Sequence, residues 1–177
     1  MTDQTAIQIL GEPNGLRFLT EKFSHLQEVP SLPDICGWLA EAEITEAEIL
    51  PYRHFNSEKY ARNRIFSNDF VEMLILAWLP GQDTLIHDHN GSHGVVRIFE
   101  GTITETKYKF DESEKIEVGS KQAVPAGMLA GVGEPDVHKL GNESDKGAIS
   151  IHVYAPPLKG MNIYEVGSSE SWLYQPE

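Results

Sequence analysis

The chain has 177 residues, 40% of them hydrophobic, and is long enough to bury a core as one domain without disulfides or metal staples. Its 27 acidic and 14 basic residues give a formal net charge of −13, which repels phosphate backbones and anionic lipids and argues against nucleic acid or membranes as partners. A single cysteine excludes an intrachain disulfide, and neither a signal-like start nor an apolar run of ~18–20 residues is present, so we expect a cytoplasmic protein, by default a monomer.

Residues 1–58 are expected to be mostly helical. Segment 15–23 carries Phe18, Leu19 and Phe23 at helical spacing, with Lys22 near the same face. A Ser-Leu-Pro-Asp start predicts a second helix from residue 31 onward, and a third short helix is expected over 45–50, ending at Pro51. Amphipathic helices of this kind most often cover the edge or end of a sheet.

From about residue 60 the pattern changes to short strands separated by turn signals such as Asn90-Gly91 and Glu100-Gly101. Strands are predicted over 60–66, 70–79, 85–89, 94–99, 102–110, 116–118, 122–124, 136–140 and 148–154. Many short strands spaced roughly 8–12 residues apart predict a mainly β fold, either a β-barrel or a double-sheet jelly roll. The barrel would span 59–157, and 158–177 would add a C-terminal strand or surface tail.

Two framed segments place three histidines where they can share one metal ion. The first reads Gly81-x5-His87-x-His89-x4-Gly94-x6-Gly101, and the second reads Gly119-x5-Pro125-x-Gly127 followed by His138-x3-Asn142. Residues two apart in a strand lie on the same face and are separated by about 6.5–7 Å along it. His87 and His89 should therefore point the same way, while Asp88 points to the other side. His138 would complete the set from another strand, and tight turns are expected at Gly81, Gly101, Gly119 and Gly127.

The remaining histidines carry weaker signals. A lone histidine is more often structural or on the surface, and we place His25 and His54 in that class. His93 lies four residues past His89, beyond the expected Asn90-Gly91 turn. It could be a fourth ligand, but a role outside the ligand set is favoured.

The two framed segments resemble the paired motifs of the cupin superfamily, which implies a small jelly-roll β-barrel with a metal inside. The usual first motif carries a glutamate three or four residues after its second histidine, where this chain has His93 and Gly94. Three neutral imidazoles would leave a divalent ion with its full charge and about three open coordination sites. Such a site suits an anionic substrate together with a small gas, whereas structural zinc is closed by four ligands. Three histidines also accept Zn, Ni, Cu or Mn.

Segment 148–154 alternates polar and apolar residues. Ser150, His152 and Tyr154 face one side, and if the apolar side packs beneath the helices, the polar side lines the barrel interior. A buried hydroxyl, imidazole and phenol must satisfy one another, so a hydrogen-bonded row is expected. From the residues alone, a purely structural network and a catalytic relay are equally open.

This row, followed by Ala155-Pro156-Pro157, is similar to the relay of the cysteine dioxygenase type I family of thiol-oxidising cupins, and so is Tyr60-Ala61-Arg62-Asn63. The resemblance covers residues 60–157 and implies that Arg62 grips the substrate carboxylate with its bidentate fork. A surface ion pair is the alternative for Arg62. Some members crosslink a cysteine after a Ser-His pair to the relay tyrosine. Here Gly94 follows that pair, so the chain resembles bacterial-type members with a free phenol.

The resemblance implies an Fe(II) enzyme that adds both atoms of O2 to the sulfur of L-cysteine, giving cysteine sulfinic acid. His87, His89 and His138 would hold the iron, which would bind the thiolate and amine of cysteine. Arg62 would anchor the carboxylate with Tyr60 alongside, and Tyr154, polarised by His152 and Ser150, would hydrogen-bond the substrate or oxygen.

Three alternatives stay open. The first is a dioxygenase of another thiol acid such as 3-mercaptopropionate, although relatives of that preference tend to carry glutamine at the Arg62 position. The second is a non-catalytic cupin that binds a small metabolite. The third, a metal-dependent isomerase or another cupin oxygenase, ranks lowest because the motif glutamate is missing.

Overall fold

A computed structural model describes residues 14–132 and 137–175. The chain begins with three helices, α1 (Gly15–Ser24), α2 (Leu32–Glu41) and α3 (Glu46–Ile49), and a 3₁₀ turn over Leu50–Tyr52. Each helix starts at a side-chain cap: Asn14 caps α1, and Ser31 and Thr45 form capping boxes with the acids three residues later. The described helices include none long and apolar enough to cross a membrane.

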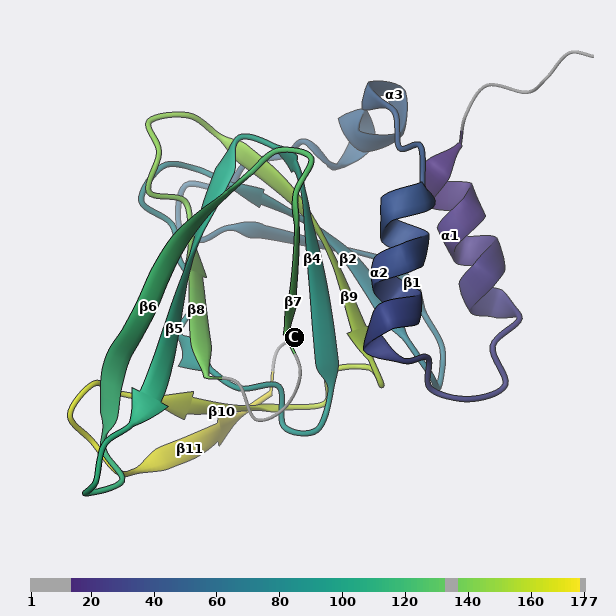
Figure 1. Ribbon diagram of the computed structural model, residues 1–177. Coiled ribbons are helices and arrows are strands. Elements are labelled where there is room, and N and C mark those ends of the chain that lie inside the picture. Colours follow the sequence, from purple (N-terminus) through teal and green to yellow (C-terminus); the bar gives the residue numbers. More distant parts are fainter. Residues whose placement is uncertain (1–13, 133–136, 176–177) are drawn as a thin grey trace, which may run out of the picture.

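Two antiparallel sheets follow and form a mainly β, double-sheet fold (Figure 1). The first sheet, in spatial order, contains β1 (Ala61–Ser67), β2 (Glu72–Trp78), β9 (Ala148–Ala155), β4 (His93–Glu100) and β7 (Leu129–Val132). The second contains β11 (Ser171–Tyr174), β10 (Met161–Tyr164), β3 (Ile86–His87), β8 (His138–Gly141), β5 (Thr102–Phe110) and β6 (Ile116–Pro125). The predicted jelly-roll architecture is confirmed.

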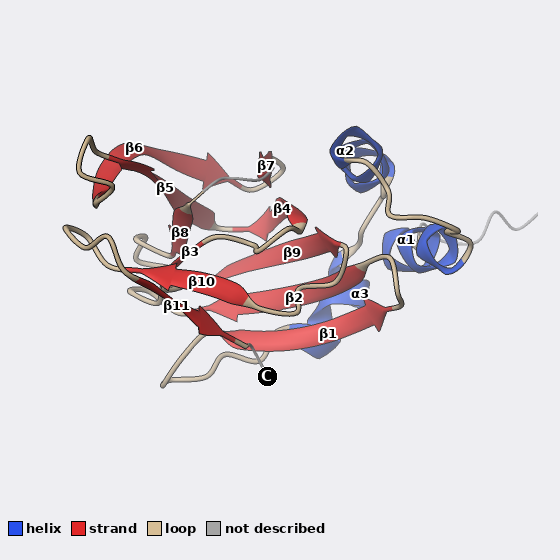
Figure 2. Cartoon of the chain, turned by 90° about the horizontal axis from the view of Figure 1, so that it is seen from below, coloured by secondary structure: helices blue, strands red, loops and turns tan. Residues whose placement is uncertain are grey.

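The helices cover the outer face of the first sheet, where we had expected them at an edge or end (Figure 2). The reason lies in β2 and β9, which bury both of their faces. One set of alternate side chains, including Ile75 and Ile151, packs against Leu19, Phe23 and Leu39 of the helices. A sheet whose outer face is apolar needs such a cover, because leaving that face in water would lose the favourable free energy of burying it.

The opposite set of alternate side chains faces the barrel interior. Leu74, Leu76 and Trp78 of β2 meet Ile98 and Ile103 there in a second apolar cluster. Ser150, His152 and Tyr154 of β9 share this inward direction, since Ile149, Ile151 and Val153 all belong to the cluster beneath the helices. The predicted alternation of segment 148–154 is therefore confirmed.

One turn prediction was wrong. Gly81, Gly101 and Gly127 have the positive φ of tight turns, as expected, but Gly119 lies inside β6, which runs unbroken through the two segments predicted separately. The pairing of β5 with β6 shifts by one residue there, from Lys107 opposite Ser120 to Tyr108 opposite Val118, so Gly119 is the extra residue of a β-bulge. A Cβ at this position would lie 3.0 Å from the carbonyl oxygen of Lys107.

Other boundaries differ because short strands give weak patterns. β3 ends at His87, so His89 lies beyond the strand that was expected to reach it. β7 was missed, because it has four residues and is defined by its partner strand more than by its sequence, and β10 lies within the predicted C-terminal strand or tail, where no separate strand was marked. β11 lies in the predicted C-terminal strand or tail and is exposed along its length. Residue 136, the predicted start of β8, lies outside the described residues.

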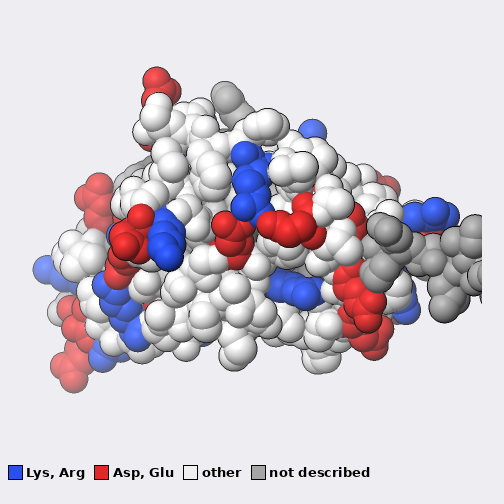
Figure 3. Space-filling model, turned by 90° about the horizontal axis from the view of Figure 1, so that it is seen from above, with Lys and Arg blue, Asp and Glu red and all other residues white. Residues whose placement is uncertain are grey.

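Charged side chains of both signs share the surface. The face shown in Figure 3 carries basic groups next to acidic ones, without a broad basic area. Among the described residues, surface ion pairs include Lys109 with Glu117 and Lys121 with Glu143, both at 2.8 Å.

Candidate metal centre

The three predicted ligands come together at the neighbouring strands β3 and β8 of the second sheet. His87 of β3 lies directly opposite His138 of β8, and His89 follows two residues after His87. One ring nitrogen of each residue lies within 4.8 Å of the other two, and all three side chains are buried. The Nε2 atoms of His89 and His138 are only 3.2 Å apart. The structure thus brings together the histidines that the sequence pattern paired.

Two of the rings are oriented through their far nitrogen. The Nδ1 of His87 lies 2.8 Å from the carbonyl oxygen of Leu85, and the Nδ1 of His138 lies 3.0 Å from Oε1 of Glu105. Both partners only accept hydrogen bonds, so each Nδ1 donates its proton, which in a neutral ring leaves the lone pair on Nε2. This tautomer is the one that a metal ligand needs.

The donor set fits a divalent metal ion. A metal about 2.0–2.1 Å from each imidazole nitrogen holds neighbouring nitrogens roughly 3.0–3.4 Å apart, which the 3.2 Å separation of His89 and His138 matches. Burial, together with the neighbouring imidazoles, lowers the pKa of His87 to about 3 and that of His89 to about 2. Both rings are therefore neutral near pH 7 and ready to bind a cation.

A buried carboxylate, Glu105 of β5, supports the site from behind. It is 2% exposed and accepts hydrogen bonds from His138 and from the side-chain amide of Gln122, the latter at 2.7 Å. Burial opposes ionisation, but the two hydrogen bonds and the nearby charge of Lys107 favour it, and the pKa of Glu105 lies below its usual value. Glu105 is not among the site residues predicted from the sequence, although the alternation of its strand gives it the same inward-facing side as Ile103.

Asp88 does point away from the two histidines that flank it. Its carboxylate accepts hydrogen bonds from the backbone N–H of Asn90 and Asn162, from the Asn162 amide and from the Tyr164 hydroxyl at 2.8 Å. These bonds close the turn at Asn90 and tie β10 to β3. Asp88 therefore fixes the segment that carries His87 and His89.

His93 and Gly94 explain why no further ligand follows His89. The Nε2 of His93 lies 3.0 Å from the Pro30 carbonyl oxygen, so this ring anchors the segment before α2 and lies outside the ligand group. A Cβ at Gly94 would lie 3.1 Å from the Tyr154 ring and 3.2 Å from the His89 ring. The absence of a side chain at Gly94 therefore lets both rings approach.

The expected polar row on β9 is present and buried. Ser150 Oγ lies 2.7 Å from Nε2 of His152, whose Nδ1 lies 3.2 Å from the Tyr154 hydroxyl. The row has one more member than predicted: Trp78 of β2 donates its indole N–H to Ser150 Oγ at 2.8 Å. Burial lowers the pKa of His152 to about 3 and raises that of Tyr154, so imidazole and phenol are both neutral near pH 7.

The indole gives this row a direction. Trp78 can only donate, so Ser150 accepts from it and satisfies its own hydroxyl proton by donating to Nε2 of His152. Neutral His152 then carries its proton on Nδ1 and donates to the Tyr154 oxygen. The phenolic proton of Tyr154 is left for the cavity, which makes Tyr154 a hydrogen-bond donor toward whatever fills it.

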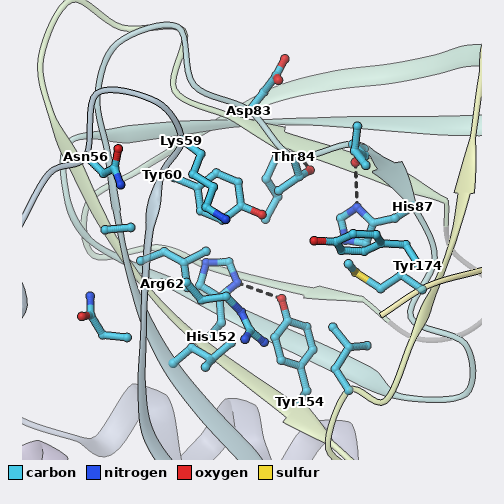
Figure 4. A pocket seen from close by; sticks show the side chains of 18 residues that line it. Asn56, Lys59, Tyr60, Arg62, Asp83, Thr84, His87, His152, Tyr154 and Tyr174 are labelled. Carbon is cyan, nitrogen blue, oxygen red and sulfur yellow. Dashed lines mark hydrogen bonds between the residues drawn. The ribbon is translucent and has the colours of Figure 1, made fainter. Parts of the chain in front are cut away.

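A cavity of about 540 Å³ opens between the sheets and is lined by five of the eight predicted site residues, namely Tyr60, Arg62, His87, His152 and Tyr154 (Figure 4). His89, His138 and Ser150 lie outside that lining. Figure 4 shows Arg62, His152 and Tyr154 grouped together, with His87 and Tyr174 at the other side of the view. The predicted residues from three separate strands and their loops therefore share one space.

Arg62 and Tyr60 are positioned by neighbours inside the first sheet. The Tyr60 ring stacks on Trp78 with ring centroids 4.3 Å apart. Arg62 has a side chain that is 24% exposed, and its Nη2 lies 3.6 Å from Oε2 of Glu72, a carboxylate that is 6% exposed. Arg64 approaches the same carboxylate at 3.8 Å but is 67% exposed and does not line the cavity. The ion pair considered for Arg62 exists, yet it lies at the cavity wall.

Comparison with known proteins agrees with this geometry. The sequence profile of the family described as cysteine dioxygenase type I matches residues 16–166. Over 155 residues the chain is 26% identical to cysteine dioxygenase type 1 of Rattus norvegicus, covering 85% of this chain and 76% of that protein. The Bos taurus protein of the same name is 27% identical over 128 residues, with 70% of this chain and 64% of that protein covered.

Solved structures agree on the fold. An uncharacterized conserved protein with a double-stranded beta-helix domain from Klebsiella pneumoniae superposes with a TM-score of 0.57 at 18% identity, covering 71% of this chain and 93% of that one. A protein from Bacillus halodurans gives 0.52 at 13% identity, covering 75% and 87%. At such identities the likeness concerns the fold alone.

The matched region includes the helices, the three-histidine group, Arg62 and the polar row of β9. It therefore spans every element that builds the cavity and its metal-binding side, except the exposed strand β11. This chain belongs to the cysteine dioxygenase type I family.

Proposed function

We propose that this protein is an Fe(II)-dependent dioxygenase that converts L-cysteine and O2 into cysteine sulfinic acid. The observation that carries the proposal is one cavity lined by Arg62, by Tyr154 with its directed hydroxyl, and by His87, through which the three-histidine ligand group reaches it. The reaction R–SH + O2 → R–SO2H needs no other reactant, because the sulfur is oxidised and both oxygen atoms end on it.

His87, His89 and His138 would hold the iron. When bound, Fe(II) would supply a Lewis-acidic centre that favours the thiolate and brings O2 to the sulfur. The three rings leave the remaining coordination positions to substrates, since the ligand group contains no carboxylate among the described residues.

Arg62 would select the substrate by its carboxylate. The planar guanidinium binds a carboxylate through two parallel hydrogen bonds, a geometry that a lysine cannot reproduce. Glu72 lies on one side of Arg62 and orients it, and Tyr60, fixed against Trp78, lines the wall beside it. A small thiol acid could then reach from Arg62 toward the His87 side of the cavity.

Tyr154 would donate its hydroxyl proton to the substrate or to the oxygen being transferred. The raised pKa of Tyr154 keeps it a phenol, and the neighbouring His152 holds the phenolic oxygen in place. Ser150 and Trp78 keep His152 in the tautomer that leaves this proton available. We further propose a single cupin domain acting as a cytoplasmic monomer.

Anaerobic loading with Fe(II), followed by L-cysteine and ¹⁸O2, tests the proposal. We expect O2 uptake and a sulfinate that carries two labelled oxygen atoms. Turnover of 3-mercaptopropionate in place of cysteine would shift the substrate within the same chemistry. No O2 uptake with any small thiol, by protein whose iron content is confirmed, would refute the assignment.

A further inference from the structure

One carboxylate is buried next to the ligand group without belonging to it. Glu105 of β5 is 2% exposed, and its Oε1 lies 3.0 Å from Nδ1 of His138 on the neighbouring strand β8. The described residues place three imidazoles and no carboxylate among the ligand atoms themselves. The negative charge of Glu105 therefore reaches the ligand group through the His138 ring instead of directly.

The orientation of Glu105 is built in. Its second oxygen, Oε2, accepts a hydrogen bond from the Gln122 amide at 2.7 Å, and Gln122 lies directly opposite Glu105 on β6. One oxygen is thus held by β6 while the other faces His138. Because the carboxylate cannot turn away without losing both bonds, the Nδ1–H of His138 has a fixed acceptor.

The ligands differ in this respect. His87 donates its Nδ1–H to a neutral backbone carbonyl, that of Leu85, at 2.8 Å, whereas His138 donates to a carboxylate. A hydrogen bond to an anionic acceptor is stronger than one to a neutral group and pushes electron density onto the imidazole. His138 should therefore be a stronger electron donor to a metal than His87.

We propose that Glu105 is a positioning residue that sets the charge and affinity of the metal centre through His138. The inference rests on the proposed three-histidine metal site. Glu105 gives a divalent ion a counter-charge that a three-imidazole set lacks, while every open coordination position stays free for substrates. Carboxylate–histidine–metal triads of this kind change metal affinity when the carboxylate is removed.

A merely structural role explains the arrangement less well. Burying a carboxylate has a desolvation cost, and replacing a buried charged group by a well-packed apolar one is often neutral or stabilising for a fold. The apolar cluster of Ile103, Val124 and Leu140 lies close by on the same strands, so an aliphatic side chain at position 105 would suit the barrel. A cation at the ligand group gives the carboxylate a partner that the fold alone does not require.

The test is a Co(II) titration against a competing chelator, with Glu105→Gln compared to wild type. The variant keeps the shape and an accepting oxygen but removes the charge, so we expect Co(II) affinity to fall by about 10–100-fold and the visible spectrum of the bound ion to shift. Glu117→Gln is the matched control, because it makes the same change on the adjacent strand β6, in an exposed pair with Lys109. Its affinity should equal that of wild type.

A Glu105→Gln protein that binds Co(II) as tightly as wild type, with the same spectrum, would overturn the inference. If Glu105→Gln does not fold, Gln122→Leu decides, because this variant keeps the charge of Glu105 but removes the hydrogen bond that orients its carboxylate. Weaker Co(II) binding by Gln122→Leu supports the role of Glu105, and unchanged binding overturns it. The proposed function fails separately. Iron-loaded wild type that oxidises no thiol refutes the dioxygenase, whatever the Co(II) affinity of the variant.

Discussion

Replacing Arg62 by glutamine separates recognition of the substrate carboxylate from the oxidation itself. Arg62 lines the cavity with a side chain that is 24% exposed, so its contact with a substrate carboxylate would be largely shielded from water. A hydrogen bond to a charged group contributes about 1.5–3 kcal/mol, which corresponds to a factor of roughly 10–150 in binding. We expect kcat/KM for L-cysteine to fall by that factor in Arg62→Gln, mostly through KM.

The substrate without a carboxylate is the internal control. Cysteamine carries the thiol and amine of cysteine but no carboxylate, so Arg62→Gln should leave its kcat/KM nearly unchanged. Steady-state O2 uptake with cysteine, 3-mercaptopropionate and cysteamine gives the three ratios. An equal loss on all three substrates would contradict carboxylate recognition and indicate that Arg62 acts on the fold or the metal site.

Arg64→Gln is the matched control variant. Arg64 lies on the same strand and approaches the same Glu72 carboxylate, at 3.8 Å against 3.6 Å for Arg62, but it is mostly exposed and outside the cavity lining. Its kcat/KM values should match wild type. Urea unfolding of both variants measures how much stability is lost when buried Glu72 loses one of its partners. This loss must be small if the kinetic result is to be assigned to substrate binding.

Three further outcomes are expected. Tyr154→Phe removes the hydroxyl that His152 orients; kcat should fall about 10–150-fold with KM nearly constant, and an unchanged kcat would remove Tyr154 from the mechanism. Metal-free protein should lose stability in urea as the pH falls from 6.5 toward 3, because burial lowers the pKa of His87 and His152 to about 3 and that of His89 to about 2. The unfolded chain binds protons in this range that the folded chain does not, so stability must rise with pH, and a flat profile would contradict the burial of neutral rings. Added Co(II) should raise the thermal midpoint of wild type but not of His138→Ala, since only a ligand that binds the folded state stabilises it; equal shifts would place the metal elsewhere.

Local patterns were sufficient for much of the fold. The alternation of β9 predicted which side chains point into the barrel, because successive residues of a strand face opposite sides whatever their partners are. The Ser31 and Pro33 signals marked the start of α2 for a similarly local reason. The four-residue strand β7 was missed, since it is defined by pairing with β4 more than by its own residues.

Distant contacts were out of reach of these patterns. Gly119 looks like a turn glycine in sequence, and only its position opposite Lys107 shows that it forms a bulge. Glu105 was overlooked because an acid in an alternating strand is usually solvated, and its value depends on Gln122 and His138, which lie 17 and 33 residues away.

By itself, the sequence determined the kind of chemistry this protein can hold: three histidines in glycine-framed segments, a Ser-x-His-x-Tyr row and an arginine two residues after a tyrosine. Residue type and spacing within one strand are local properties, and they survive in any fold that forms those strands. The tertiary structure decided which of these groups share one cavity, which proton Tyr154 can give, and that a buried carboxylate, Glu105, lies behind His138. Those outcomes depend on how strands far apart in the chain pair, because hydrogen bonds and burial between them exist only once the two sheets have closed.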